Sequence, residues 1–177
     1  HVAKEIRVTQ KGATPMLADE WRQALADLCR QAAAADAEDQ ADFLRVARTL
    51  LAVAPDDQAH RFADLPSRAG FEILLAAQAW ESAALALLPD TAGYLLSRSG
   101  DGVAIASLVL PECSEDVCAQ ASSPALAMVS ALAGAIMAAV VTHAGGMPVR
   151  SGYGRDVPAA DGFEIDEPWK LAPVLLH

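Results

Sequence analysis

The stretch from Val117 to Val149 contains no charged residue, although 20% of the chain is charged. Inside it, the apolar run Ala125–Val141 is rich in alanine and shorter than the roughly 20 residues that a membrane-spanning helix needs. The run also contains Ser130 and Gly134, and no Lys or Arg flanks it. We therefore expect a helix that is buried inside a water-soluble fold, not a membrane span.

A helix start and a row of small residues mark this segment. Ser123-Pro124 combines a capping hydroxyl with a proline suited to the first turn, so we expect a helix over 124–143. Ser130, Gly134 and Ala138 recur at every fourth position and form a stripe of small side chains. Such a stripe lets a second backbone approach closely, and the partner is a helix of the same chain or of a second subunit.

Between residues 92 and 122 the hydrophobic period changes from about 3.6 to 2, which predicts a small antiparallel sheet. Two strand-like runs, Tyr94–Arg98 and Val103–Leu110, flank the turn Ser99–Gly102, whose Gly and Asp suit a tight hairpin. The second run is apolar on both faces, so it is buried on both sides, or on one side with the other at an interface. Val117–Ser122 is a candidate third strand.

Helical periodicity dominates the amino-terminal part of the chain. After a weak strand or an ordered arm over 2–13, we expect a first helix that starts at Thr14-Pro15 and ends within Ala32–Asp36. A second helix is expected over Glu38–Ala54, and a third, longer one over 66–88. Because the third helix is apolar nearly all round, it should lie between two layers.

These elements predict an α+β fold in a single domain over residues 1–144. The helical amino-terminal half packs with the sheet of residues 92–122, and the helices over 66–88 and 124–143 form the layer that covers this sheet. Residues 145–177 are rich in Pro and Gly but also carry large apolar side chains, which a disordered tail normally lacks. We expect them to form an irregular strap, docked on this domain or on a neighbour. Its candidate partner contacts are Tyr153, Arg155, Phe163 and Trp169.

Two segments carry a family resemblance. The apolar run Trp80–Pro89 ends at a proline before the expected hairpin, and Ala121–Leu132 reads Ala-Ser-Ser-Pro-Ala-Leu-Ala-Met-Val-Ser-Ala-Leu. Together they resemble small phage-associated α/β-sandwich domains, in which a Thr-Pro-Ala-Leu-Ala-Leu signature opens the closing helix. Ser123 stands where that threonine would be. The resemblance implies a structural or accessory module without an assigned reaction, and it supplies no catalytic residue.

Charge and cysteine content exclude several classes of function. The formal net charge of the 177-residue chain is −10 and its basic residues are scattered, so we expect neither nucleic-acid binding nor attachment to an anionic membrane. Three cysteines are too few for a disulfide framework, and with no signal peptide apparent the expected compartment is the cytoplasm.

The candidate chemistry is sparse, and we assign no catalytic, cofactor-binding or metal-binding residue. Cys113 and Cys118 could form a metal or redox pair, but a metal site needs tighter spacing and further ligands nearby. His60 follows Asp56 and Asp57, a pattern that could serve a general base, but no serine or cysteine nucleophile motif accompanies it.

Two hypotheses of function follow. In the first, the chain is a non-catalytic interaction or assembly module, a homodimer or a protein-binding unit that uses the helix over 124–143 or the strap. In the second, it is a small-ligand-binding regulator or an enzyme. Its pocket would then lie between the sheet and the amino-terminal helices, with Trp21, Trp80, Tyr94 or His60 in the wall.

Overall fold

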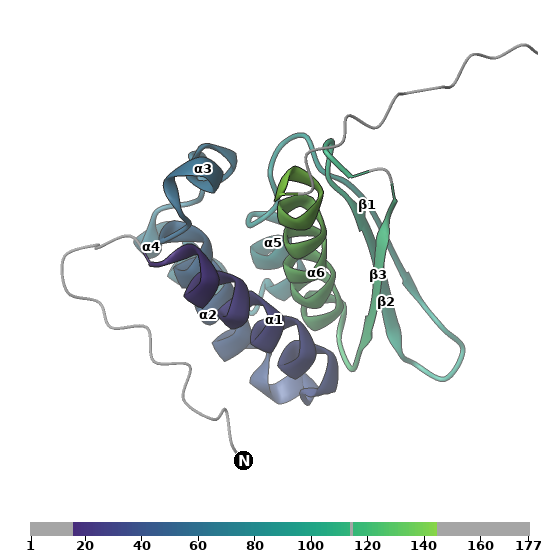
Figure 1. The fold of residues 1–177 in the computed structure, drawn as a ribbon. Helices are drawn as coiled ribbons and strands as arrows, with labels where there is room; N and C mark the ends of the chain where they lie inside the picture. Colours follow the sequence, from purple (N-terminus) through teal and green to yellow (C-terminus); the bar gives the residue numbers. More distant parts are fainter. Residues whose placement is uncertain (1–15, 114, 145–177) are drawn as a thin grey trace, which may run out of the picture. The chain divides into compact units, whose positions relative to one another are not determined.

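The computed structural model describes residues 16–113 and 115–144, which form an α+β fold (Figure 1). Several of the predicted elements are present. The described elements in chain order are α1 (Ala18–Ala34), a 3₁₀ turn (Ala37–Asp39), α2 (Gln40–Ala52), α3 (Asp56–Ala59), a second 3₁₀ turn (His60–Phe62), α4 (Arg68–Ala76), α5 (Trp80–Leu85), β1 (Gly93–Arg98), β2 (Ala104–Val109), β3 (Val117–Ala121) and α6 (Pro124–Ala144).

The first two helices pack through apolar stripes that the sequence pattern predicts. Trp21, Leu25 and Leu28 of α1 are buried, and α2 contributes Leu44 and Leu50 to the same core. The indole Nε1 of Trp21 donates a hydrogen bond of 2.8 Å to the carbonyl oxygen of Leu50. A buried indole needs such a partner, so this bond fixes α1 against α2.

The predicted start of the first helix is wrong. The helix α1 begins at Ala18, with Leu17 at the N-cap position and no side-chain cap. Thr14-Pro15 and the weak strand over 2–13 lie outside the described residues. The predicted end of the helix is confirmed, because α1 ends at Ala34.

The long helix predicted over 66–88 is also wrong, since the chain forms two helices there. Ser67 caps α4 by accepting a 3.1 Å hydrogen bond from the backbone N–H of Gly70, and α4 ends at Ala76. At Gln78 the backbone takes the left-handed conformation, with φ at 55°. The chain then turns into α5, which packs on α6 and not on the sheet.

The sheet is three-stranded and antiparallel in the order β1-β2-β3, as predicted. Ser99 N–H donates to the Val103 carbonyl oxygen at 2.9 Å and closes the hairpin, and Gly102 supplies a φ of +89° in its turn. Side chains alternate along β2: Ala104, Ala106 and Leu108 are buried against α6.

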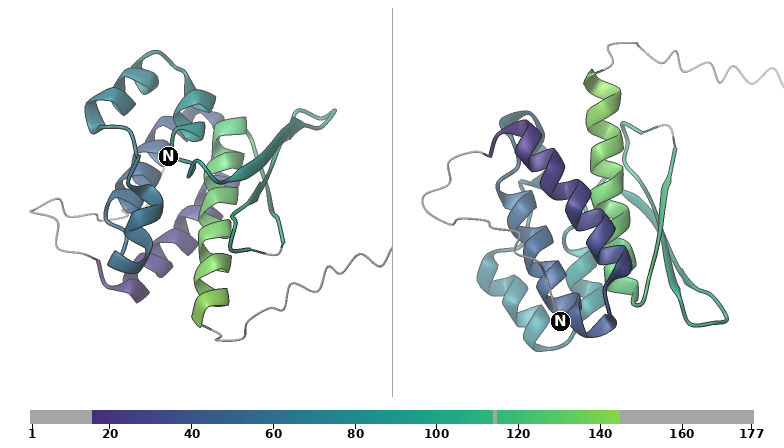
Figure 2. Two further views of the ribbon diagram at one scale, coloured as in Figure 1. Left: turned by 90° about the horizontal axis from the view of Figure 1, so that it is seen from above. Right: turned by 60° about the horizontal axis from the view of Figure 1, so that its bottom comes forward.

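The helix α6 forms the central layer of the described fold (Figures 1 and 2). The sheet lies on one side of α6, and helices α1, α2 and α5 pack on the other. Ser123 caps this helix, because its Oγ accepts a hydrogen bond of 3.3 Å from Leu126 N–H. The helix that lies between two layers is therefore α6 and not the predicted helix over 66–88. The sequence predicts that the helices over 66–88 and 124–143 both cover the sheet, but in the structure the inner face of β2 packs on α6.

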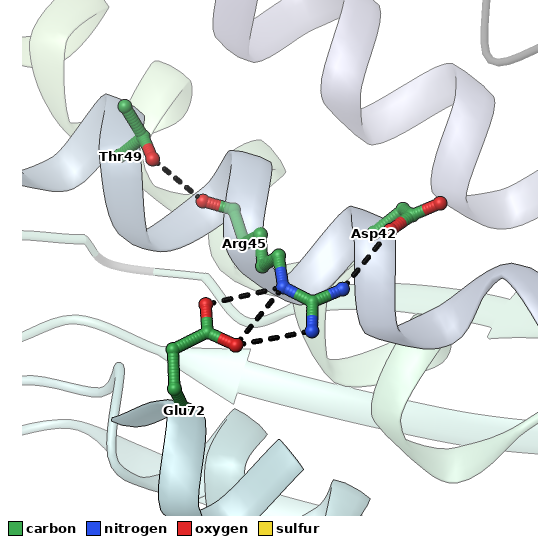
Figure 3. A network of polar contacts seen from close by, with 4 residues as sticks. All are labelled: Asp42, Arg45, Thr49 and Glu72. Carbon is green, nitrogen blue, oxygen red and sulfur yellow. Dashed lines mark hydrogen bonds and ion pairs between the residues drawn. The ribbon is translucent and has the colours of Figure 1, made fainter. Parts of the chain in front are cut away.

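An exposed polar network joins α2 to α4 (Figure 3). The guanidinium of Arg45 donates through Nε and Nη2 to the carboxylate of Glu72 at 3.0–3.2 Å, and through Nη1 to Asp42 at 3.1 Å. The hydrogen bonds from Arg45 hold the pKa of Glu72 below its usual value, and the two acids raise the pKa of Arg45. Among the described residues, no helix has both the length and the apolar character required to cross a membrane.

Candidate interaction surface

One face of the sheet points away from α6, and we call it the outer face. Strand register places the alternate positions of the three strands there, and no described helix lies over them (Figure 2). The side chain of Leu95 is 67% exposed on this face, and Val109 is 37% exposed. None of the outer-face strand residues with a side chain is charged. They are Leu95, Ser97, Ile105, Ser107, Val109, Cys118 and Gln120.

Strand β1 forms an edge of the described sheet and is exposed on both of its faces. Leu95 lies on the outer face, while Tyr94, which is 53% exposed, lies on the inner face beside buried Leu108. An edge strand presents unpaired backbone N–H and C=O groups, and proteins usually protect such edges with Lys, Pro or a bulge. The run Gly93–Arg98 contains no Lys or Pro, and its pairing with β2 runs in unbroken register.

The exposed edge position of β1 could not be predicted from the sequence pattern. Periodicity placed a strand at Tyr94–Arg98 but did not show that it lies at an edge. The available signal was the succession Tyr94-Leu95-Leu96, which puts a large apolar side chain on each face of a strand next to a turn.

The part of the outer face that lies toward β3 is polar. Ser107 donates a hydrogen bond to the carboxylate of Asp116, and Cys118 Sγ donates to the same carboxylate at 3.6 Å. The hydroxyl of Ser107, followed by a backbone N–H and Cys118, holds the pKa of Asp116 below its usual range. The exposed apolar groups therefore gather toward β1, away from this acidic group.

The small-residue stripe of α6 is used inside the chain. Ser130 is buried, and its hydroxyl donates to the carbonyl oxygen of Cys29 on α1 at 2.9 Å. A Cβ on Gly134 would come within 2.9 Å of a methyl group of Val117 on β3. The close approach that the stripe permits is thus made to α1 and β3, while Ala138 is half-buried. The other predicted contacts, Tyr153, Arg155, Phe163 and Trp169, lie outside the described residues.

The two candidate cysteines point in different directions. Cys113 Sγ lies 3.8 Å from the carbonyl oxygen of Ala135 on α6, whereas Cys118 is exposed on the outer face. Burial raises the pKa of the Cys113 thiol, and the charge of Glu112 adds to the effect. The geometry offers no shared site for the pair. Among residues 16–113 and 115–144, no three His, Cys, Asp or Glu side chains come together in a way that could hold a metal ion.

The space between the sheet and the amino-terminal helices is filled by α6, where a pocket was expected. Of the residues proposed for the pocket wall, His60 and Tyr94 are exposed and Trp80 is half-buried against the core. Trp21 lines a hollow of about 310 Å³, but this hollow lies away from the sheet. Its lining residues are Ala18, Trp21, Arg22, Pro55, Asp57, Gln58 and Val140.

A second hollow of about 280 Å³ lies beside Arg61 and the turn that follows α5. The side chain of Arg61 is only 7% exposed, and its Nη2 lies 3.4 Å from a carboxylate oxygen of Glu112 in the β2–β3 connection. Nε and Nη1 of Arg61 and Oε2 of Glu112 are buried without a protein partner. The pair links the short turn after α3 to the connection between β2 and β3, and Arg61 also lines the hollow.

Comparison of the chain with protein-family models, with curated proteins and with solved structures found no match. The resemblance to phage-associated α/β-sandwich domains therefore stays a prediction.

Proposed function

We propose that this chain is a non-catalytic assembly module that associates with a second copy of itself through β1 and the adjoining outer face. The observation that carries the proposal is the exposure of Leu95, at 67%, on an uncharged sheet face of a chain whose formal net charge is −10. Strand positions facing away from α6 would normally be polar if they only met solvent.

The energetics favour covering this region. Burying a leucine side chain completely stabilises a complex by about 1.5–3 kcal/mol before the costs of association are subtracted. Tyr94 and Val109, which are also exposed, lie beside it on β1 and β2. Negative charges at the border of a contact would repel each other when two acidic chains associate, but the strand residues of the outer face carry no charge.

Two other features support an assembly role over a ligand-binding one. Helix α6 occupies the space that a pocket would need, and α1 and β3 occupy the small-residue stripe to which a helix of a second copy would have to bind. The resemblance to phage-associated α/β-sandwich domains also implies a structural or accessory module.

The test compares two lysine substitutions in the full chain by light scattering across a range of concentrations. Wild type should be dimeric at high micromolar concentration, and Leu95→Lys should be monomeric because it places a charge on the edge strand. Ile73→Lys is the matched control, since Ile73 is 69% exposed on α4, away from the sheet. A wild-type chain that stays monomeric, or a dimer that Leu95→Lys leaves intact, would overturn the proposal.

A further inference from the structure

We propose that the two copies join edge to edge: β1 pairs antiparallel with β1 of the second copy about a two-fold axis at Leu95. The three strands of each copy then form one continuous sheet. This inference rests on the proposed function and specifies its geometry.

The backbone of β1 is oriented for such pairing. Ser99 N–H bonds to Val103 O across the hairpin, so the alternate residues Ser97 and Leu95 also direct their backbone groups toward β2. The intervening residues Leu96 and Tyr94 direct their N–H and C=O groups outward, away from the described sheet. These outward groups are the ones that a further antiparallel strand would bond.

The side chains of β1 are self-complementary in one register. A two-fold axis perpendicular to the sheet requires residues that lie opposite each other to share a face. With Leu95 opposite Leu95 of the second copy, Tyr94 lies opposite Leu96, and the apolar side chains meet on both faces. Leu95 is then in a non-hydrogen-bonded pair, in which the two Cα atoms approach to about 4.5 Å.

The ends of β1 are complementary in charge. Exposed Arg98 closes the strand, and exposed Asp90 lies in the turn that precedes it. Antiparallel pairing brings Arg98 of each copy near Asp90 of the other copy. A positive and a negative side chain therefore meet at each end of the paired strands. Parallel pairing would place the two arginines together.

The distribution of apolar groups favours the edge over a face-to-face contact of two sheets. On the outer face, Leu95, Ile105 and Val109 lie on β1 and β2, whereas β3 presents Cys118 and Gln120. A face-to-face contact would bury these polar groups of β3, but an edge contact leaves them in solvent and covers Leu95, the most exposed of the apolar residues on this face.

Cysteine cross-linking of the full chain tests the register. In a Cys118→Ser background, Leu95→Cys should form an intermolecular disulfide under mild oxidation, because about 4.5 Å between Cα atoms lies within the disulfide range. Ser97→Cys is the matched control on the same strand and face. Its two copies would lie about 14 Å apart along the strand, so it should not cross-link.

The outcomes separate this inference from the proposed function. A chain that dimerises by light scattering but cross-links through Ser97→Cys, or through neither cysteine, overturns the edge pairing and leaves the assembly role standing. A chain that remains monomeric at every concentration overturns both the edge pairing and the assembly role. Efficient disulfide formation by Leu95→Cys alone supports the proposed register, provided that no disulfide forms when the oxidation is carried out below the concentration of the dimer transition.

Discussion

Among the described residues, Gln78 is the single non-glycine residue with a positive φ. Its N–H donates a hydrogen bond of 3.0 Å to the carbonyl oxygen of Leu75. The N–H of Ala79 donates one of 2.9 Å to the carbonyl oxygen of Leu74. These two bonds form a Schellman motif, a helix ending that usually places glycine at the left-handed position. The side chain of Gln78 is exposed, so no neighbour clashes with it, but its Cβ makes the left-handed conformation energetically unfavourable.

Gln78→Gly should therefore stabilise the protein, by about 0.5–1 kcal/mol, because glycine adopts this φ without the steric penalty. Urea denaturation measures the change. The control is Ala77→Gly one residue earlier, where φ is −78° and glycine gains nothing. Equal effects of the two substitutions would contradict the assignment of strain to Gln78.

The cysteines should differ in reactivity. Cys118 is exposed, whereas Cys113 is half-buried and burial raises the pKa of its thiol, so Cys113 is both less accessible and less ionised than an ordinary cysteine. We expect iodoacetamide to alkylate Cys118 about tenfold faster or more at pH 8, as measured by peptide mass spectrometry. Labelling of Cys113 at the rate of Cys118 in the folded protein would contradict its position against α6.

At this scale the sequence predicts caps and turns better than exposure. The cap at Ser123 and the hairpin turn ending at Gly102 follow from local chemistry, and the structure confirms both. The exposure of Leu95 depends on which strand lies at the edge, and a leucine in a strand gives no information about that. The break at Gln78 was hidden because neither glycine nor proline marks it.

Packing between α6 and β3 depends on one close approach. A Cβ on Gly134 would meet a methyl group of Val117 at 2.9 Å, so any larger residue at that position forces Val117 or the helix to shift. Alanine improves helix propensity by about 1 kcal/mol, but crowding a well-packed site costs about 1–3 kcal/mol.

A double-mutant cycle on Gly134→Ala and Val117→Ala tests this contact. Alone, Gly134→Ala should gain nothing or destabilise. In the Val117→Ala background it should be more favourable by about 1 kcal/mol, because the crowded methyl group is gone. The free energy of unfolding of the four proteins gives the coupling energy. Additive effects would show that Val117 does not limit the approach.

The contact between α2 and α4 should respond to acid. The pKa of Glu72 is lowered in the folded state by its hydrogen bonds to Arg45, so its contribution is present above the unfolded pKa and is lost as pH falls through the folded one. Because the pair is exposed, Glu72→Gln should cost only about 0.2–1 kcal/mol near pH 7. The stability difference between wild type and variant should shrink below pH 4, and a constant difference would contradict the pairing.

Element types could be read from periodicity, but the order of layers could not. The sheet, its connectivity and the closing helix over 124–143 follow from the local pattern and are confirmed. Both the run over 66–88 and α6 are broadly apolar in sequence. Which of them occupies the centre depends on contacts between residues far apart in the chain, such as the bond from Ser130 to Cys29.

For the whole molecule, the central position of α6 accounts for the proposed function. Helix α6 packs against all three strands on one side and against α1, α2 and α5 on the other, and no described element lies over the outer face (Figure 1). The edge strand β1 and Leu95 are left uncovered as a result. Assembly with a second copy would complete the sheet at this edge.

Hydrogen exchange of the β1 amides tests this account most directly. In the wild-type 177-residue chain, the amides of Leu95 and Ser97, which face β2, should be protected at every concentration. The outward amides of Tyr94 and Leu96 should be protected only at concentrations where the chain is dimeric, and should exchange rapidly on dilution and in Leu95→Lys. Rapid exchange of Tyr94 and Leu96 in the dimer would contradict the proposed pairing of β1.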